Sequence, residues 1–195
     1  RCTMATNGGF FNVTSGACFG NVVSQGTVIQ TDVRHNVHFG VRQSGTIFVG
    51  HLQPDDVIFS PDPFQSLVAG LGWLVRDGKS YWEQSMDKED QSSQTNGEEF
   101  ATIRSGRTSV GFDAEGRVIL LSIDGRSNVY GVNLNDMTEM LLGFGAVNAI
   151  NLDGGGSVTT AVNGGQLVNY PSDVCRESQF GELCERPTTT IMCIL

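Results

Sequence analysis

The stretch from Asn148 to Thr160 contains the residue types best suited to chemistry in this chain. An apolar run ending at Leu152 leads directly to the carboxylate of Asp153, and three consecutive glycines, 154–156, follow it. Because glycine takes positive φ without Cβ strain, successive backbone N–H groups can converge there on an anion. An acid beside an anion site indicates phosphate chemistry, whereas a tight turn or bulge between two strands is the structural alternative. This stretch alone leaves both interpretations open.

Further candidates lie near other predicted strands. Asp124 follows the apolar strand Val118 to Ile123, so a second acid lies at a strand end. Arg107 has small neighbours that leave space for a ligand, and a guanidinium can hold phosphate through two parallel hydrogen bonds; its alternative is a surface salt bridge. We therefore take Asp153, Asp124 and Arg107 as candidate catalytic residues. The candidate substrate-binding residues are Asn7, Gly9, Asn151, Gly154, Gly155, Ser157 and Thr159.

The elements that must position these residues are mostly short strands. Turn residues at Ser44-Gly45 and Asp77-Gly78 predict hairpins over Phe39 to Leu52 and Trp73 to Trp82. Asn133 is typical of a helix cap, and the apolar spacing after it predicts a helix to about Leu142. Roughly ten short strands against one clear helix predict an α+β fold, a single domain dominated by antiparallel strands and hairpins with few helices.

Two other segments are less regular. The stretch Pro54 to Ala69 has room for two short helices, each opened by a proline. The stretch Gln84 to Glu99 is polar and acidic without periodicity, so we expect a long surface loop. It lacks the spacing of a calcium loop, and His35 and His38 have no further ligands near them in sequence. We therefore expect no metal and no cofactor.

Composition excludes several classes of protein. With 195 residues, of which 39% are hydrophobic, the chain can form one domain that buries about 70% of its unfolded surface. A net charge of −9 argues against nucleic-acid binding, which needs a clustered positive surface. The sequence has no run of about 18 apolar residues, so we expect no membrane attachment to be encoded in it. Because it starts at Arg1 rather than methionine, we expect a fragment of a longer protein.

The five cysteines lie near the two ends of the chain and form no C-x-x-C pair, which is not a zinc pattern. The sequon Asn12-Val13-Thr14 makes Asn12 a candidate for glycosylation. Together these features favour a lumenal or extracellular protein over a cytosolic one. Buried free thiols and an unused sequon are the alternative.

Four ordered segments resemble the phosphodiester glycosidase family. They are Asn7-Gly8-Gly9-Phe10-Phe11, Cys18-Phe19-Gly20-Asn21-Val22-Val23-Ser24, Arg107-Thr108-Ser109-Val110-Gly111 and Asn151-Leu152-Asp153-Gly154-Gly155-Gly156-Ser157. The resemblance implies that residues 1–195 are a catalytic domain whose N-terminal part is missing. It also implies a hydrolase that removes N-acetylglucosamine from the phosphodiester covering mannose 6-phosphate on lysosomal-enzyme glycans. Its partners would be glycoproteins in the Golgi lumen or outside the cell, and its oligomeric state is left open.

The resemblance also implies roles for the candidate residues. Arg107 and the glycine run would stabilise the departing phosphate, while Asp124 or Asp153 would activate water or stabilise positive charge on the sugar. The assignment of these two roles stays open, as does the choice between C–O and P–O cleavage. Two other functions also stay open: a relative acting on microbial cell-wall phosphodiesters, and a secreted sugar-binding module without catalysis.

The spacing of the cysteines is also similar to that of the family. It implies one disulfide between Cys175 and Cys184 and a second between Cys18 and Cys193. Cys2 would then pair with a cysteine upstream of Arg1.

Overall fold

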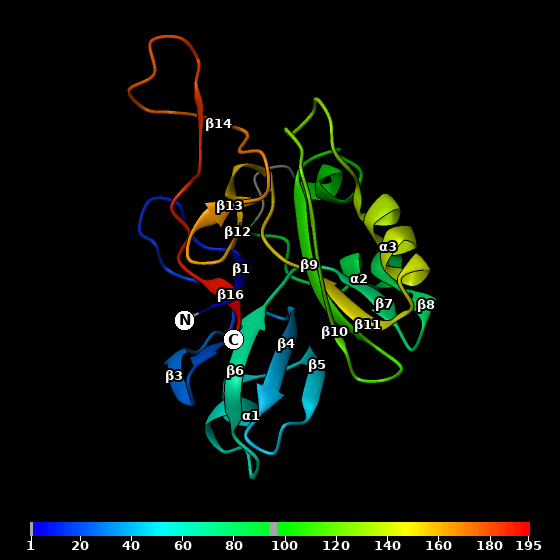
Figure 1. Cartoon of the computed structure of the whole chain (residues 1–195). Helices are drawn as coiled ribbons and strands as arrows, with labels where there is room; N and C mark the ends of the chain where they lie inside the picture. The colour runs from blue at the N-terminus through cyan, green and yellow to red at the C-terminus, as the bar shows by residue number, and fades with distance from the viewer. Residues whose placement is uncertain (1, 94–96) are drawn as a thin grey trace.

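The computed structural model describes residues 2–93 and 97–195. This part of the chain forms two five-stranded sheets, one four-stranded sheet and one two-stranded hairpin, with antiparallel pairing throughout (Figure 1). Three α-helices accompany the strands: α1 (Pro54–Ile58), α2 (Trp82–Met86) and α3 (Leu134–Gly143). Two 3₁₀ turns are η1 (Gly97–Ala101) and η2 (Gly155–Ser157). The predicted α+β class with mostly antiparallel strands is confirmed.

The first five-stranded sheet has the strand order β3-β2-β6-β4-β5. Its strands are β2 (Val22–Ser24), β3 (Thr27–Gln30), β4 (Val37–Arg42), β5 (Ile47–His51) and β6 (Phe64–Ala69). The predicted hairpin is β4–β5, and Gly45 takes φ +88° at its turn. Of the two helices predicted between Pro54 and Ala69, only α1 forms. The second prediction is wrong because the apolar run from Phe64 pairs with β2 and β4 at the centre of the sheet.

The second five-stranded sheet has the order β10-β9-β11-β7-β8. Its strands are β7 (Trp73–Arg76), β8 (Lys79–Ser80), β9 (Arg107–Asp113), β10 (Val118–Ile123) and β11 (Ala146–Asn151). Helix α3 packs on it through Leu134, Met137 and Leu141, which are fully buried. The helix begins where predicted, because Asn133 Oδ1 accepts a hydrogen bond of 2.8 Å from Asp136 N.

The four-stranded sheet, ordered β13-β12-β1-β16, joins the first and last segments of the chain. Its strands are β1 (Met4–Asn7), β12 (Thr160–Val162), β13 (Gln166–Leu167) and β16 (Ile191–Ile194). Pairing of β1 with β16 brings Cys2 beside Cys193, with Cα atoms 5.4 Å apart, and these two cysteines form a disulfide. The predicted bond between Cys18 and Cys193 is therefore wrong.

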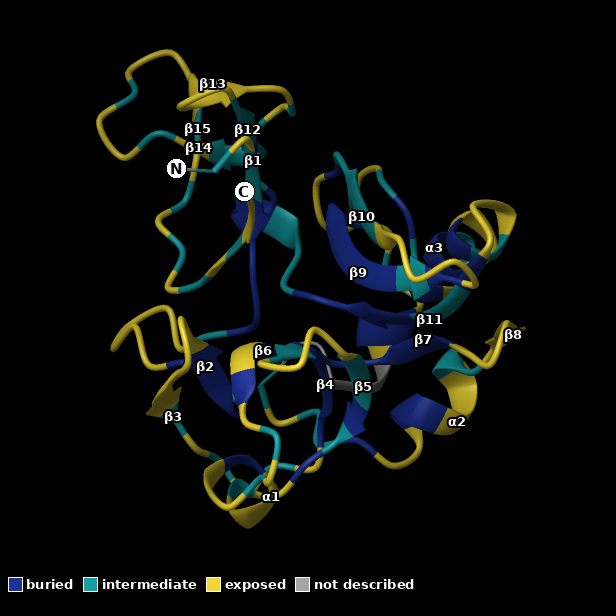
Figure 2. Cartoon of the chain, turned by 60° about the horizontal axis from the view of Figure 1, so that its bottom comes forward, coloured by how far each residue is buried: buried dark blue, intermediate teal, exposed yellow. Residues whose placement is uncertain are grey.

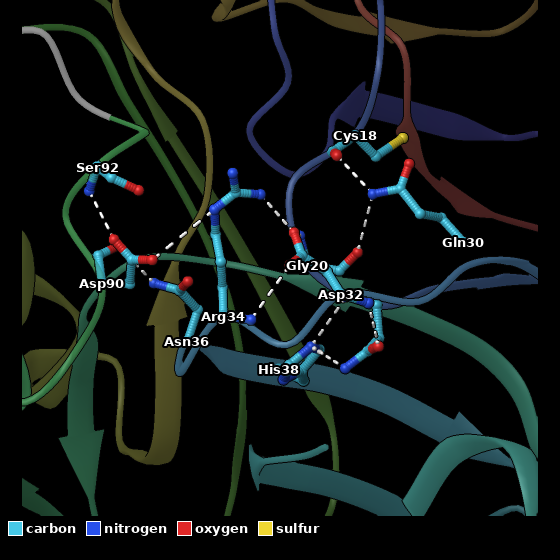
Figure 3. A network of polar contacts seen from close by, with 10 residues as sticks. Cys18, Gly20, Gln30, Asp32, Arg34, Asn36, His38, Asp90 and Ser92 are labelled. Carbon is cyan, nitrogen blue, oxygen red and sulfur yellow. Dashed lines mark hydrogen bonds and ion pairs between the residues drawn. The ribbon is translucent and has the colours of Figure 1, made fainter. Parts of the chain in front are cut away.

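Cys18 is instead a buried free thiol. Its backbone carbonyl accepts a hydrogen bond from Gln30 Nε2, in a polar network that also ties Asp32 to Gly20 N and to Arg34 (Figure 3). An isolated bridge to Phe11 holds it from the other side. These contacts keep Cys18 away from β16.

A disulfide-closed hairpin projects from the body of the molecule at the top left of Figure 1. It consists of β14 (Asp173–Val174) and β15 (Leu183–Cys184), and it contains the predicted bond between Cys175 and Cys184. The two disulfides fit an oxidising compartment.

The core lies along the inner strands of the second sheet, as Figure 2 shows for β7, β9 and β11. Ile150 at the end of β11 and Leu152 just after it are fully buried. Asp153 is therefore the first residue to leave the core. Within the described residues, no helix combines the length and apolar character needed to cross a membrane.

Candidate active site

A polar cavity of about 190 Å³ opens where β11 ends and β9 begins. Its lining includes Arg107, Asp153, Gly154, Gly155, Gly156 and Arg186. Two of the three predicted catalytic residues, Asp153 and Arg107, thus lie in one cavity although 46 positions separate them in sequence. Arg186 joins them from the C-terminal segment.

Two residues at the end of β1, Asn7 and Gly8, hold the backbone of Asp153 through hydrogen bonds to its N–H and C=O groups. Asp153 N donates to Gly8 O at 3.1 Å, and Asp153 O accepts from Asn7 Nδ2 at 2.7 Å. Asn7 is itself buried, and its Oδ1 accepts from Thr108 Oγ1 at 2.8 Å. Asn7 therefore positions the loop that carries the acid, with both ends of its amide bonded within the protein.

The carboxyl group of Asp153 has an unusual environment. Burial raises its pKa to about 6, and the Ser157 hydroxyl, the Gly154 N–H, Arg186 and Arg107 oppose this rise. Gly154 N donates to Asp153 Oδ1 at 2.9 Å. Ser157 Oγ forms no well-aligned hydrogen bond within the described chain, so its influence on the carboxyl is through proximity. A carboxyl that titrates near neutral pH is suited to accept and release a proton.

Arg107 lies at the start of β9 with its guanidinium buried. Its Nη2 donates to Phe100 O at 2.7 Å and to Ile103 O at 3.0 Å, and its Cζ lies 4.5 Å from the centre of the Phe100 ring. Burial lowers its pKa to about 10, while the charge of Asp153 opposes this. Within residues 2–93 and 97–195, no ion pair joins Arg107 to a carboxylate. A cation held by neutral carbonyls keeps its charge available to an anion in the cavity.

The glycine run differs from the predicted anion nest. The N–H of Gly154 bonds to Asp153, and the N–H of Gly155 donates to Gly106 O at 2.8 Å. These two donors are therefore used within the protein. Gly155 has φ +57°, and a Cβ on Gly154 would collide with Gly106 O. The glycines allow two segments to approach the Asp153 loop closely.

Asp124, the third predicted catalytic residue, lies outside the cavity lining. Both of its carboxylate oxygens accept from Tyr170 N, at 3.1 and 3.0 Å. This contact ties the end of β10 to the segment that follows β13. The structure therefore does not bring Asp124 together with Asp153 and Arg107.

Five of the predicted binding residues also lie outside the cavity lining, and Asn7, described above, is one of them. Asn151 is fully buried, and its Nδ2 donates to Leu71 O at 3.0 Å. Gly9 donates to Thr190 Oγ1 at 3.0 Å, and a Cβ there would come within 2.5 Å of Ala69 O. Ser157 Oγ and Thr159 Oγ1 are buried without hydrogen-bond partners among the described residues.

Sequence reasoning missed other parts of the cavity, above all Arg186. Ser105 and Ser127 also line it, with their hydroxyl oxygens 2.8 Å apart. The one signal for Arg186 in the sequence is that basic residues are rare, since only 12 residues of the chain are lysine or arginine. Its position follows Cys184 by two residues, so the disulfide hairpin determines where it lies.

The chain belongs to the phosphodiester glycosidase family, whose model matches residues 1–195. It is similar to N-acetylglucosamine-1-phosphodiester alpha-N-acetylglucosaminidase of Bos taurus, at 42% identity over 99% of this chain and 37% of that protein. The Homo sapiens protein of the same name is 40% identical over 99% of this chain and 38% of its own length. The chain thus spans under two fifths of these curated relatives.

A solved structure supports the same family. The zebrafish catalytic domain of N-acetylglucosamine-1-phosphodiester alpha-N-acetylglucosaminidase, described as auto-inhibited by its pro-peptide, matches with a TM-score of 0.91 and 39% identity. The match covers 99% of this chain and 63% of the zebrafish chain. A hypothetical protein from Synechocystis shares the fold at a TM-score of 0.57 and 17% identity, covering 88% of this chain and 49% of its own.

Proposed function

We propose that this chain is the catalytic part of a hydrolase that removes N-acetylglucosamine from a sugar phosphodiester. The observation that carries the proposal is one cavity containing a carboxyl of pKa about 6 and a buried guanidinium that has no carboxylate partner among the described residues. The names of relatives at 40–42% identity over 99% of the chain support the same chemistry.

In the proposed reaction, the Asp153 carboxylate takes a proton from water, whose oxygen attacks the anomeric carbon of the sugar. The C–O bond to phosphate breaks, and its electron pair leaves with the phosphate. Such a leaving group needs little protonation, because its second pKa is about 6. Arg107 binds the diester anion before the reaction and the phosphate during it.

The natural substrate would be the phosphodiester that covers mannose 6-phosphate on lysosomal-enzyme glycans. We place the reaction in the Golgi lumen or another part of the secretory pathway. Asn12 would be glycosylated there: it is exposed, and its Oδ1 accepts from Thr14 N and Ser15 N in a surface turn.

The direct test is incubation with an N-acetylglucosamine-phospho-mannose disaccharide, followed by mass spectrometry. The proposal expects free N-acetylglucosamine and mannose 6-phosphate. Binding without cleavage would instead indicate a sugar-binding module. Cleavage of a microbial cell-wall phosphodiester, with the disaccharide left intact, would indicate the microbial activity.

Arg107→Lys sharpens this test. Lysine keeps the charge but loses the planar fork, so we expect kcat/KM for the phosphodiester to fall at least tenfold, or ~1.4 kcal/mol, with little loss on a neutral aryl glycoside. Both substrates are measured with wild type and variant. Equal losses on both would mean that Arg107 supports the fold and that the phosphate is bound elsewhere.

A further inference from the structure

Arg186 enters the cavity from a different part of the chain than Arg107 and Asp153. Those two residues lie at ends of neighbouring strands in the second sheet, whereas Arg186 follows the disulfide-closed hairpin β14–β15. The cavity therefore has one wall that belongs to the C-terminal segment. This wall supplies a second guanidinium.

Asp173 fixes the direction of this guanidinium. Arg186 Nε donates to Asp173 Oδ2 at 2.7 Å, and Nη2 donates to Oδ1 at 3.1 Å. A guanidinium carries five N–H donors, so this fork uses two of them and leaves others for a ligand. Asp173 pairs with Cys184 in the register of the hairpin, and the bond from Cys184 to Cys175 closes the hairpin covalently.

Gly156 provides an independent observation. A Cβ at this position would overlap both Asp173 Oδ1 and Arg186 Nη2. Gly156 does not have the positive φ that requires glycine at position 155. Position 156 therefore requires glycine because the Asp173–Arg186 pair occupies the space where a Cβ atom would lie. The pair lies directly on the loop that carries Asp153.

We infer that Arg186 is a second phosphate-binding residue, directed by Asp173, which stabilises the charge that develops on the departing phosphate. The inference rests on the proposed function. A diester has one negative charge, and the monoester released has about −1.5 to −2 near pH 7. When the C–O bond breaks and its electron pair moves to phosphate, a cation already fixed in the cavity wall stabilises the more negative transition state more than the bound diester.

Arg186→Gln tests the inference, with Arg176→Gln as its matched control. Both changes remove one positive charge near the same hairpin, but Arg176 is exposed and is not part of the cavity lining. On the N-acetylglucosamine-phospho-mannose disaccharide, we expect kcat to fall at least tenfold in Arg186→Gln, with KM changed less than threefold. Arg176→Gln is expected to stay within twofold of wild type.

Asp173→Asn separates the positioning residue from the binding residue. It weakens the fork without removing the guanidinium, so we expect a smaller loss of kcat than in Arg186→Gln and little change on a neutral aryl glycoside. If Arg186 only stabilised the hairpin, its loss would lower the melting temperature and would reduce kcat equally on the diester and on the neutral aryl glycoside. That result would overturn the inference.

A binding experiment keeps this inference distinct from the proposed hydrolysis. Calorimetric titration with mannose 6-phosphate, the phosphate-bearing product, measures phosphate binding without turnover. We expect Arg186→Gln to bind it at least tenfold more weakly than wild type and Arg176→Gln to bind it normally. Wild type that binds this ligand but cleaves no diester would contradict the proposed function alone. Equal affinity of Arg186→Gln and wild type, or no binding by wild type, would contradict the role of Arg186.

Discussion

Glu89 is a buried carboxylate and Asp153 is a half-buried one in the cavity wall, and their surroundings also differ in the number of hydrogen-bond donors. Glu89 Oε2 accepts from Val37 N at 3.2 Å and from Gly72 N at 3.1 Å, and Oε1 accepts from Ser85 Oγ. His51 Nε2 lies 3.5 Å from Oε1. Burial alone would raise the pKa of Glu89, but these groups outweigh it and lower the pKa.

Among residues 2–93 and 97–195, Asp153 receives a single well-aligned backbone donor, from Gly154, and burial keeps its pKa raised at about 6. Glu89, whose pKa is lowered, accepts hydrogen bonds from β4, α2 and the β6–β7 connection. The next residue, Asp90, continues the same network through Arg34 and Asn36 (Figure 3). The number of donors, rather than burial, thus separates a structural carboxylate from one able to exchange a proton.

The largest expected effect is on activity, in Asp153→Asn. Because the amide cannot accept the proton from water, we expect kcat to fall at least ~100-fold, about 2.7 kcal/mol. The folded-state pKa of about 6 exceeds the ordinary value, so the ionised carboxylate opposes folding at pH 7. We therefore expect a melting temperature at pH 7 equal to or above that of wild type. A variant that melts normally and still turns over substrate would refute the role of Asp153.

A loss of stability is expected in Glu89→Gln. Glutamine has one acceptor oxygen where Glu89 has two, so its NH₂ faces donors whichever way the amide lies. It meets either the Ser85 hydroxyl or the two backbone N–H groups, and those donors lose their acceptor. We expect urea unfolding to show a loss of about 2 kcal/mol, with kcat unchanged for the folded protein. Glu139→Gln, at an exposed position of α3, is the control. A selective loss of kcat in Glu89→Gln would show that the two carboxylates are not separate in function.

The pH dependence of stability is expected to have opposite signs for the two carboxylates. The raised pKa of Asp153 means that stability falls as pH rises toward 6. The lowered pKa of Glu89 means that stability falls as pH drops below about 4.3, its ordinary value. Subtracting each variant's unfolding free energy from that of wild type between pH 3.5 and 7 isolates each contribution. Difference curves with the same sign would contradict these assignments.

Local sequence patterns predicted much of the fold. The β4–β5 hairpin and α3 follow from turn glycines, a capping asparagine and apolar spacing. The acidic segment 84–99, expected to be a surface loop, begins inside α2 and contains the buried Glu89; its residues 94–96 lie outside the described part of the chain. Composition could not reveal Glu89, because its donors come from β4, the β6–β7 connection and α2, which meet only in the folded protein.

Only part of the site could be predicted, because some of its residues are placed by contacts that form only in the folded protein. Strands β10 and β11 both flank β9 and run in the same direction, so Asp124 and Asp153 do follow strand ends at one edge of the sheet. Strand β9 lies between β10 and β11, so two strand spacings, about 10 Å, separate the strands that precede the two acids. Asp124 then accepts hydrogen bonds from Tyr170 N and does not line the cavity. Arg186 was invisible to motif reasoning because its position depends on a distant ion pair and on the space above Gly156.

The central position of β1 in its sheet sets an order for the assembly of the site during protein synthesis. Strand β1 is synthesised before both of its neighbours, β12 and β16, which follow it only after both five-stranded sheets in sequence. Asn7, at the end of β1, can bond to Asp153 only after Asp153 has been synthesised, and β1 gains its second neighbour only when β16 follows. Contacts so distant in sequence form slowly, because the chain loses much entropy in closing the loop between them. Asn7 can therefore hold Asp153 in place only after the 146 positions that separate them have been synthesised.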